Sequence, residues 1–374
     1  MRIILCVTND IVTDCRIGRV AASLLKLPAT ITIIGLSLPN SPVFPDYPYK
    51  TKRFRLVFRK GPLFYAEFNI RLFFRLLFTP ADLLVANDLD TLAAVYAASF
   101  FKRLPMVYDS HEYFTELPEL VDRLLVKKIW TLLESSLMPR IRYASTVSPS
   151  IASEYRRKYG INMHVVRNLP YRMERLPVPE VSLRRQDEKI IMYQGSLNSG
   201  RGLETAIRAM NYTEHAILII AGSGYLEVEL RELVNSQGLQ DKVKFLGRIP
   251  PEDLRKYTVQ ADLGISLEEN LGLNYFYALP NKLFDYIQSR VPVLVSGLPE
   301  MTAIVQKYGV GMITDSPDPD RLATTFMLML GDQPQRKLWK ENLEHAAAEL
   351  CWEKEEPVLL DLYHSVISGQ EQTL

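Results

Sequence analysis

Residues 190–207 read IIMYQGSLNSGRGLETAI and contain the three parts of a strand–turn–helix unit. The apolar run from Ile190 predicts a buried strand, the glycines after it predict a tight turn, and the segment from Leu203 has helical spacing. The pattern repeats at once, because AILIIAGSG (216–224) precedes the helical segment YLEVELRELVNSQG (225–238). Short apolar strands that alternate with helices indicate a parallel sheet covered on both faces.

The same alternation extends in both directions and predicts two α/β domains. VKFLGRI (243–249), DLGISL (262–267) and PVLVSG (292–297) continue it downstream, and RIILCVT (2–8), TITIIGL (30–36), ADLLVAND (81–88) and LPMVYDS (104–110) form an earlier series. Between the series, residues 168–189 have three prolines, many charges and no period, which is typical of a linker. We expect domains at 1–167 and 189–350, a linker at 168–188, and a C-terminal helix within 351–374 that packs back on the first domain.

The composition excludes several classes of protein. A formal net charge of +1 over 374 residues does not fit a globally basic nucleic-acid binder. Three scattered cysteines are too few for a disulfide framework or a zinc cluster. The apolar runs are too short for a membrane span or a signal-peptide core. We therefore expect a cytoplasmic protein of two domains.

The glycine-rich turn after Gln194 is the first candidate site. Gly195, Gly200 and Gly202 allow a close backbone approach to an anion, and Arg201 adds a positive charge before a helix N-terminus. The turn differs from a P-loop, because Arg201-Gly202 replaces the Lys-Ser/Thr pair. A glycine-capped turn without a ligand is the structural alternative. Gly222, which ends the next strand, repeats the device.

The stretch ALPNKLFDYIQS (278–289) is the second candidate site. Asn281 is placed to cap a helix whose first turn carries Lys282, and Asp285 follows three residues later on the same side. Lys282 can face a phosphate while Asp285 accepts hydrogen bonds from ribose hydroxyls. An ordinary surface ion pair between Lys282 and Asp285 is the alternative.

His111 follows a predicted strand end in YDSHEYF (108–114) and is one of only five histidines. A zinc-protease motif is excluded, because the HExxH pattern needs a second histidine where Thr115 stands. His111 therefore has two interpretations. It either contacts a ligand at the sheet edge, or Asp109 and Glu112 hold it for structural reasons.

These stretches, taken in order, resemble the retaining GT-B glycosyltransferases, and more narrowly the family 4-like group that builds bacterial surface polysaccharides. YDSHEYF, STVSPSIASEY, VVRNLP, QGSLNSGRGLETAI, IIAGSG, VKFLGRIPPEDLRKYTVQADLGIS and LPNKLFDYIQSRVPVLVSGLPE carry the resemblance, which runs from about Met1 to Trp352. It implies an α/β fold of two Rossmann-like, doubly wound parallel-sheet domains that face a central cleft.

The resemblance also implies roles for individual residues. Asp285 matches the second acid of the family's E-x7-E motif, which holds the donor ribose, and Arg201 matches the basic residue at the pyrophosphate. The motif's first Glu is replaced by Tyr277, with Glu268 and Glu269 farther upstream.

The remaining donor positions come from the same resemblance. Gly195, Ser196, Gly222 and Asn281 would line the nucleotide-sugar site, where Ser196 replaces the usual arginine, so that one phosphate contact is either lost or supplied by Lys282. Arg248 and Ile249 occupy the turn that meets the base. His111 matches the histidine that touches the donor sugar.

The implied reaction moves a sugar from a UDP- or GDP-linked donor to a glycan or lipid-linked acceptor, with retained configuration, in cell-envelope polysaccharide synthesis. We expect Arg201, Lys282 and His111 to form the catalytic set, and we expect no cofactor, no metal and no nucleic-acid partner. Two alternatives are a nucleotide-sugar epimerase and a degenerate protein that binds a nucleotide sugar without turnover.

The acceptor side is assigned to the first domain. Asp14, Arg16 and Arg19 are candidate acceptor or phosphate contacts. Residues 50–80 have eight Lys or Arg against one Glu among many aromatics, which predicts a basic helix. This helix either rests on anionic lipid at the inner face of the cell membrane or packs against the core with a solvated basic face.

Overall fold

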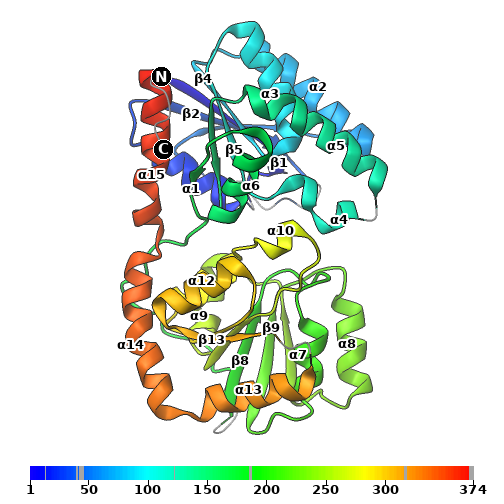
Figure 1. Ribbon diagram of the computed structural model, residues 1–374, viewed down its shortest axis with the longest axis vertical. Helices are drawn as coiled ribbons and strands as arrows, with labels where there is room; N and C mark the ends of the chain where they lie inside the picture. The colour runs from blue at the N-terminus through cyan, green and yellow to red at the C-terminus, as the bar shows by residue number, and fades with distance from the viewer. Residues whose placement is uncertain are drawn as a thin grey trace. The chain divides into compact units, whose positions relative to one another are not determined.

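The computed structural model describes residues 1–12, 14–38, 41, 46–121, 123–184, 188–315 and 318–369. The chain forms two compact units (Figure 1). Unit 1 comprises Met1–Asn168 and the chain from Glu355 onward, and unit 2 comprises Leu169–Lys354. The two predicted Rossmann-like domains are thus present, each with its own sheet.

Unit 1 is built on a sheet in which every strand pairing is parallel, in the order β3-β2-β1-β4-β5-β6-β7 within the described residues. Its central strands are apolar and buried on both faces, as a covered parallel sheet requires. The strands are β1 (Arg2–Asp10), β2 (Thr30–Leu36), β3 (Lys50–Phe54), β4 (Leu83–Asn87), β5 (Met106–Ser110), β6 (Tyr143–Thr146) and β7 (His164–Val165).

Helices flank this sheet on both sides. α3 packs on β4, β1 and β5 and is itself covered by α2 and α5, while α1 and α15 lie on the opposite side (Figure 1). The helices are α1 (Cys15–Leu24), α2 (Pro62–Phe78), α3 (Leu89–Lys102), α4 (Pro118–Val121), α5 (Leu124–Leu137), α6 (Pro149–Tyr159) and α15 (Trp352–Ser368), with 3-10 turns at Phe114–Glu116 and Met138–Arg140.

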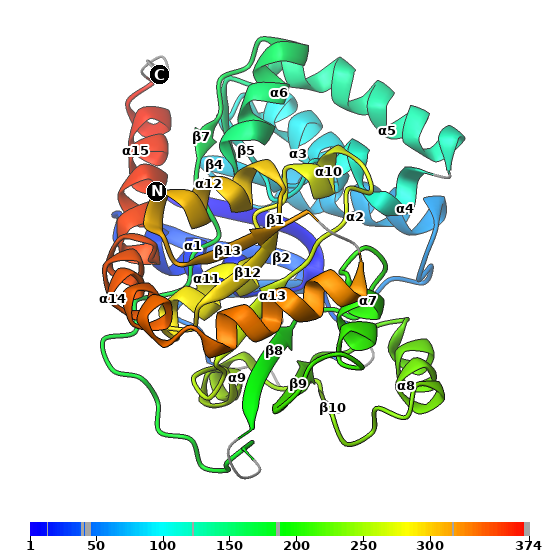
Figure 2. The same cartoon turned by 60° about the horizontal axis from the view of Figure 1, so that its bottom comes forward.

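Unit 2 repeats the architecture with the parallel order β10-β9-β8-β11-β12-β13 within the described residues (Figure 2). The strands are β8 (Lys189–Gln194), β9 (Ala216–Ala221), β10 (Val243–Gly247), β11 (Leu263–Ser266), β12 (Val293–Ser296) and β13 (Gly311–Thr314). The helices are α7 (Leu203–Ala209), α8 (Glu227–Ser236), α9 (Pro251–Thr258), α10 (Leu273–Phe276), α11 (Asn281–Gln288), α12 (Pro299–Tyr308), α13 (Pro319–Gly331) and α14 (Gln333–Glu349).

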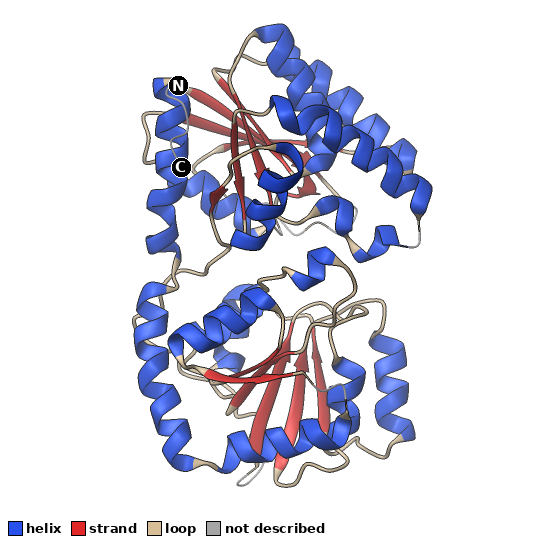
Figure 3. Ribbon diagram, viewed as in Figure 1, coloured by secondary structure: helices blue, strands red, loops and turns tan. Residues whose placement is uncertain are grey.

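The core of unit 2 consists of one apolar layer on each face of this sheet. Alternate residues of β8 enter different layers: Ile191 and Tyr193 join the layer that α7, α8 and α13 cover, and Ile190 and Met192 join the layer under α11, α12 and α14. Figure 3 shows helices on both sides of each sheet. Because the central strands β8, β9 and β11 are buried from both sides, polar side chains in the sheet collect where these strands end.

Two predicted segments differ from the structure. Residues 50–80 are not one basic helix: Lys50–Phe54 form β3, which pairs with β2 at the sheet edge, and the helix begins at Pro62. The expected linker is attached to unit 2, because Met173 N donates to Gln288 Oε1 and Leu183 N donates to Gln260 Oε1. Residues 185–187 of that segment, and 370–374 of the C-terminal one, lie outside the described residues.

None of the helices in the described ranges has the length and apolar character needed to cross a lipid bilayer. The same part of the chain holds no group of three or more His, Cys, Asp or Glu side chains arranged to bind a metal ion.

Candidate functional site

Each sheet has one point where the strand order reverses, and polar residues gather at the carboxyl ends of the strands there. In unit 1 the reversal lies between β1 and β4, and in unit 2 between β8 and β11. Open α/β sheets bind ligands at such points, because the loops leave in opposite directions and open a crevice. The predicted site residues of each unit are found at these edges.

In unit 2, the carboxylate of Glu268 holds two cations. Glu268 follows β11, its side chain is fully buried, and its Oε1 lies 2.5 Å from Lys282 Nζ and 3.4 Å from Arg201 Nη1. Its Oε2 accepts a hydrogen bond of 2.7 Å from Ser266 Oγ. Arg201 comes from the glycine-rich turn and Lys282 from the first turn of α11, so one carboxylate joins the two predicted segments.

Aromatic rings support both cations. The amine of Lys282 lies 4.5 Å from the centre of the Tyr193 ring, and the guanidinium of Arg201 lies 4.7 Å from that of Tyr275. Such contacts favour the charged form over a buried neutral one. The cluster has one negative and two positive side chains, and therefore carries a net positive charge.

The pKa values of the cluster follow from burial and pairing. Burial raises the pKa of Glu268, but the charges of Lys282 and Arg201 and the hydrogen bonds from Lys282 and Ser266 together outweigh it and bring the pKa below the ordinary value. Burial lowers the pKa of Lys282, and the Glu268 charge offsets only part of this effect. Glu268 therefore favours the protonated form of a buried amine.

The three glycines of the turn have different structural roles. A side chain at Gly195 would meet Lys282 Cε at 3.4 Å, so this exposed glycine leaves room beside the cation. Gly200 and Gly202 do not face open space, because a Cβ would lie 2.5 Å from Leu271 Cδ1 and 2.4 Å from the Leu267 carbonyl oxygen, respectively. These two glycines allow two loops to pack closely, and contact between their backbone and an anion stays a prediction.

Asp285 lies one turn beyond Lys282 on α11 and is oriented by a polar chain. Thr258 Oγ1 donates to Gln194 Oε1 at 2.7 Å, and Gln194 Nε2 donates to Asp285 Oδ2 at 3.0 Å. A carboxylate fixed in this way is a suitable acceptor for hydroxyl groups.

The other predicted donor residues lie at the same sheet edge. Ser196 is exposed beside Gly195, and Gly222 follows β9 with a Cβ position only 1.8 Å from the Gly195 carbonyl oxygen. Arg248 and Ile249 follow β10, two strands from β8.

Asn281 does not cap α11, contrary to prediction. Pro280 takes the capping position with an extended backbone, so the helix begins at Asn281, which lies exposed in its first turn. Tyr277, at the position of the motif's first Glu, ends the short helix α10 and packs its ring 5.2 Å from that of Phe276.

In unit 1, His111 lies between two carboxylates. Its Nε2 is 3.0 Å from Asp109 Oδ2 and its Nδ1 is 3.4 Å from Asp88 Oδ2, while its backbone N–H donates to Asp88 Oδ1 at 2.7 Å. Asp88 adopts a φ of 60°, which is rare outside glycine and costs on the order of 1–3 kcal/mol. A strained residue at the strand-order reversal indicates a functional position.

The histidine of this cluster is a cation at neutral pH. Burial lowers the pKa of His111, but the charges of Asp88 and Asp109 more than reverse the effect and raise it to about 9. Burial also raises the pKa of Asp109, and Arg16 and His111 hold it well below its usual range. Asp90, next to Asp88, has its pKa raised to about 7, mainly by burial. Whether His111 touches a donor sugar stays a prediction.

The predicted acceptor residues of unit 1 have structural partners. Arg16 is buried and donates to Asp109 Oδ1 at 2.9 Å and to the Val166 carbonyl at 3.0 Å. Asp14 caps α1 through the backbone N–H groups of Arg16 and Ile17. Arg19 is bonded to Asn168.

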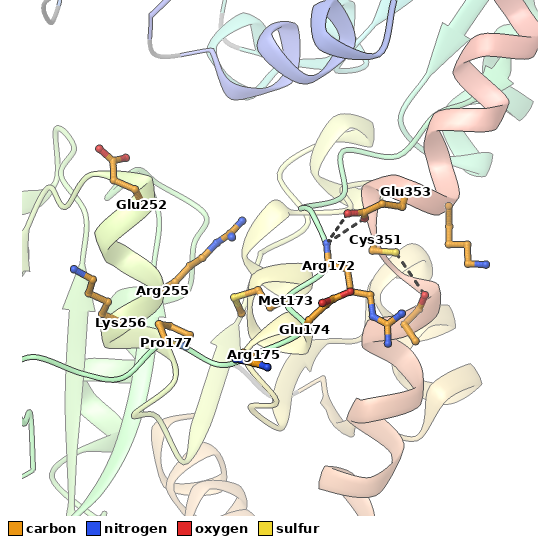
Figure 4. A pocket seen from close by; sticks show the side chains of 12 residues that line it. Arg172, Met173, Glu174, Arg175, Pro177, Glu252, Arg255, Lys256, Cys351 and Glu353 are labelled. Atoms are coloured by element: carbon orange, nitrogen blue, oxygen red, sulfur yellow. Dashed lines mark hydrogen bonds between the residues drawn. The ribbon is translucent and has the colours of Figure 1, made fainter. Parts of the chain in front are cut away.

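A separate cavity of about 680 Å³ lies in unit 2 and contains none of these residues (Figure 4). Its walls come from the segment after Leu169, from α9, and from the junction of α14 and α15, where Arg172 N donates to Glu353. The lining residues are Arg172, Met173, Glu174, Arg175, Pro177, Glu252, Arg255, Lys256, Ala348, Cys351, Glu353 and Lys354.

Two family models match the chain, and each falls within one unit apart from a residue at the boundary. The model for glycosyltransferase family 4 matches residues 16–169, and the model for glycosyl transferases group 1 matches residues 176–346. The chain belongs to the family 4-type glycosyltransferases. Both positively charged side chains of the unit 2 cluster lie within the second match.

Solved structures of the same fold cover the whole chain. Sucrose-phosphate synthase from Thermosynechococcus elongatus is 17% identical, with a TM-score of 0.80 over 99% of this chain and 100% of that one. HepE from Anabaena, solved in complex with UDP and glucose, is 16% identical, with a TM-score of 0.74 over 98% of this chain and 100% of that one. These likenesses confirm the predicted GT-B fold.

The curated relatives match over shorter stretches. An uncharacterized glycosyltransferase of Methanocaldococcus jannaschii is 30% identical over 153 residues, which is 40% of this chain and 37% of that protein. The match thus spans well under half of that relative.

Sequence reasoning found Arg201, Lys282 and Asp285 but missed how they are held. The motif pattern places Glu268 only upstream of the missing first Glu, and no pattern in the sequence singles out Gln194. The SLEEN stretch (266–270) offers two adjacent glutamates, and only the path of the loop decides which one turns inward.

Proposed function

We propose that this protein is a retaining glycosyltransferase that moves a sugar from a UDP- or GDP-linked donor to a glycan or lipid-linked acceptor in cell-envelope polysaccharide synthesis. The observation that carries the proposal is the pairing of Arg201 and Lys282 around Glu268, beside the exposed turn Gly195-Ser196. Two cations at the carboxyl edge of a parallel sheet suit the diphosphate of a nucleotide sugar.

The cations would act on the leaving group. As the bond between the sugar's anomeric carbon and the phosphate oxygen breaks, negative charge develops on the diphosphate. Positive charges already in place stabilise that charge without reorganisation, which is usually the largest contribution to such catalysis. Ser196 lacks the basic side chain that the family carries at this position. Lys282 lies beside the adjacent Gly195, so its amine would replace the missing contact with the phosphate.

The neighbouring residues suit the rest of the nucleotide. Asp285, oriented by Gln194, would accept hydrogen bonds from the ribose hydroxyls. Arg248 and Ile249 would meet the base at the same sheet edge. The presence of UDP in the Anabaena HepE structure supports a uridine donor as the first to test.

We propose front-face displacement for the transfer step. The acceptor oxygen bonds to the anomeric carbon on the side from which the diphosphate departs, and the acceptor's proton passes to the departing phosphate oxygen. This step needs no protein nucleophile and no metal, because Arg201 and Lys282 take the role of the neutralising cation. Chain residues then contribute positioning and electrostatic stabilisation.

We further propose that unit 1 contacts anionic lipid through a basic aromatic face on α2 and α3. The rings of Phe73 in α2 and Phe101 in α3 lie 5.9 Å apart. Phe78, Phe100 and Phe101 are 83%, 71% and 68% exposed. We define this face as Ile70, Arg71, Phe74, Arg75, Phe78, Phe100, Phe101 and Arg103, which line two adjoining shallow hollows.

The charges on this face indicate which kind of surface it would bind. Arginines interleaved with exposed rings favour a surface that is both apolar and negatively charged, as the inner face of a cell membrane is. The acceptor would then be lipid-linked.

Thermal unfolding with a panel of nucleotides tests the donor proposal. UDP, GDP, ADP, CMP and TDP, free and sugar-linked, are each compared with protein alone, because a ligand of the folded state raises the unfolding midpoint. A shift with one diphosphate series identifies the base. An anomeric assay with that donor must then give a product of retained configuration. An absence of any shift would contradict a nucleotide-sugar site, a shift without any transfer would favour a degenerate binding protein, and an interconverted donor sugar would favour an epimerase.

A further inference from the structure

Glu268 is the one residue of the described unit 2 cluster that has no direct task in the proposed chemistry. It is fully buried, it carries the same sign of charge as the diphosphate, and it lies 2.5 Å from Lys282 Nζ and 3.4 Å from Arg201 Nη1. An acid beside an anion site weakens anion binding by repulsion. Its presence therefore calls for a physical reason.

We propose that Glu268 is a positioning residue that keeps Lys282 protonated and aimed at the diphosphate, at a cost in affinity for that anion. This inference rests on the proposed function and adds a regulatory property to the same site. Glu268 acts through Lys282 and Arg201 and does not itself contact the donor.

Geometry supports an orienting role. Ser266 fixes one carboxylate oxygen at 2.7 Å, which leaves the other directed at both cations. Lys282 is 7% exposed, and its carbon chain passes Gly195 while its amine faces the Tyr193 ring. Without the carboxylate, a flexible amine in this position has no charged partner among its described contacts to set its direction.

Electrostatics supports the protonation role. Glu268 and Arg201 from the neighbouring loops and the ring of Tyr193 from β8 act on Lys282, and Asp285 is the acid that follows it on its own helix. Burial and Arg201 both favour the neutral amine, and Glu268 opposes them. Removal of the Glu268 charge leaves burial and Arg201 largely unopposed, so the amine loses its proton at lower pH.

Two opposite effects of Glu268→Gln follow, and pH separates them. While Lys282 is still protonated, the variant lacks the repelling carboxylate and binds a nucleoside diphosphate at least as tightly as the wild type. As pH rises, Lys282 in the variant becomes neutral and affinity falls. We expect a loss of affinity of roughly tenfold relative to the wild type as pH is raised from about 7 upward, a range that lies above the second ionisation of a phosphate near pH 6.

The experiment is a calorimetric titration of UDP, GDP and ADP, which share the diphosphate, into the full-length protein across that pH range. Glu268→Asp retains the charge and should restore most of the wild-type profile. Asp262→Asn is the matched control, because Asp262 is a buried, ion-paired acid at the opposite end of β11, 3.0 Å from Arg336. It should lower stability and leave the pH profile of binding unchanged.

A Glu268→Gln profile parallel to that of the wild type would overturn the inference and make Glu268 purely structural. If Glu268→Gln does not fold, Ser266→Ala, which frees the carboxylate at Oε2, must steepen the pH dependence in the same direction. If the wild type binds none of the three nucleotides, the proposed function fails first, and this result is distinct from a parallel profile.

Discussion

The central charged residues at the two sheet edges have opposite signs and opposite surroundings. In unit 1 the central cation His111 lies between two acids, and in unit 2 the central acid Glu268 lies between two cations. The unit 2 cluster therefore presents positive charge at its edge, whereas in unit 1 the charges of Arg16 and His111 are matched by Asp88 and Asp109. This difference is the physical reason to place the diphosphate on unit 2.

The His111 cluster predicts a pH dependence of stability. The folded pKa of about 9 lies above the ordinary value of 6.5, so the stabilisation is complete below pH 6.5 and is lost as pH rises through about 9. The loss amounts to about 3 kcal/mol at most, since one unit of pKa corresponds to about 1.4 kcal/mol. Denaturant unfolding at several pH values should show this slope in the wild type and a much smaller one in His111→Gln.

His345→Gln serves as the control for that measurement, because His345 is exposed on α14. Asp90, with a pKa of about 7, adds a loss of stability over a lower pH range, and His111 itself lowers that pKa, so the slopes are compared near pH 9. Equal slopes in His111→Gln and the wild type would contradict the ion-pair geometry.

At the scale of elements, the turns of unit 2 depend on how closely two loops pack. Gly202 and Gly238 both have a φ of +67°, but a Cβ at Gly202 would lie 2.4 Å from the Leu267 carbonyl oxygen, and nothing lies within 4 Å at Gly238. Gly238→Ala should cost about 1 kcal/mol of unfolding free energy for the backbone conformation alone. Gly202→Ala should cost about 1–3 kcal/mol more, because a backbone carbonyl must move.

Chemical denaturation of the two variants checks this difference. Equal losses would show that the loop at Leu267 yields freely, and the position of Glu268 would then not be fixed by the turn.

Strong periodicity explains which elements were predictable. Buried strands such as β4 and β9 are uninterrupted apolar runs, and the sequence predicted them. The sequence did not predict β3, because an edge strand is half exposed. Its residues, KTKRF, are mostly charged and lack the run of apolar side chains that marks a buried strand. Arg201 and Lys282 were predicted from their local motifs, whereas the role of Glu268 depends on contacts between residues far apart in sequence.

For the whole molecule, we expect association with membranes through unit 1. The protein should sediment with vesicles that contain anionic lipid and remain in solution with zwitterionic ones, and salt should weaken the binding. Changing Phe74, Phe78 and Phe101 together to serine should reduce binding, since each removed ring loses on the order of 1 kcal/mol of apolar burial. Val178→Ser, at an exposed apolar position of unit 2, is the control.

Sedimentation of the triple variant at the wild-type level would exclude the basic aromatic face as the contact. Absence of wild-type binding to anionic vesicles would remove the lipid proposal and leave the donor site unaffected.

Calorimetric titration of UDP, GDP and ADP into the wild type and Arg201→Ala tests whether the unit 2 cluster binds the diphosphate. Arg231→Ala is its matched control: both guanidiniums pair with a glutamate and lie over an aromatic ring, at 4.7 Å for Arg201 and 4.4 Å for Arg231. We expect Arg201→Ala to weaken nucleoside diphosphate binding about tenfold to a hundredfold, because a charge-assisted contact is lost. Arg231→Ala should bind like the wild type. Equal affinities in all three proteins would contradict the assignment of the diphosphate to this cluster.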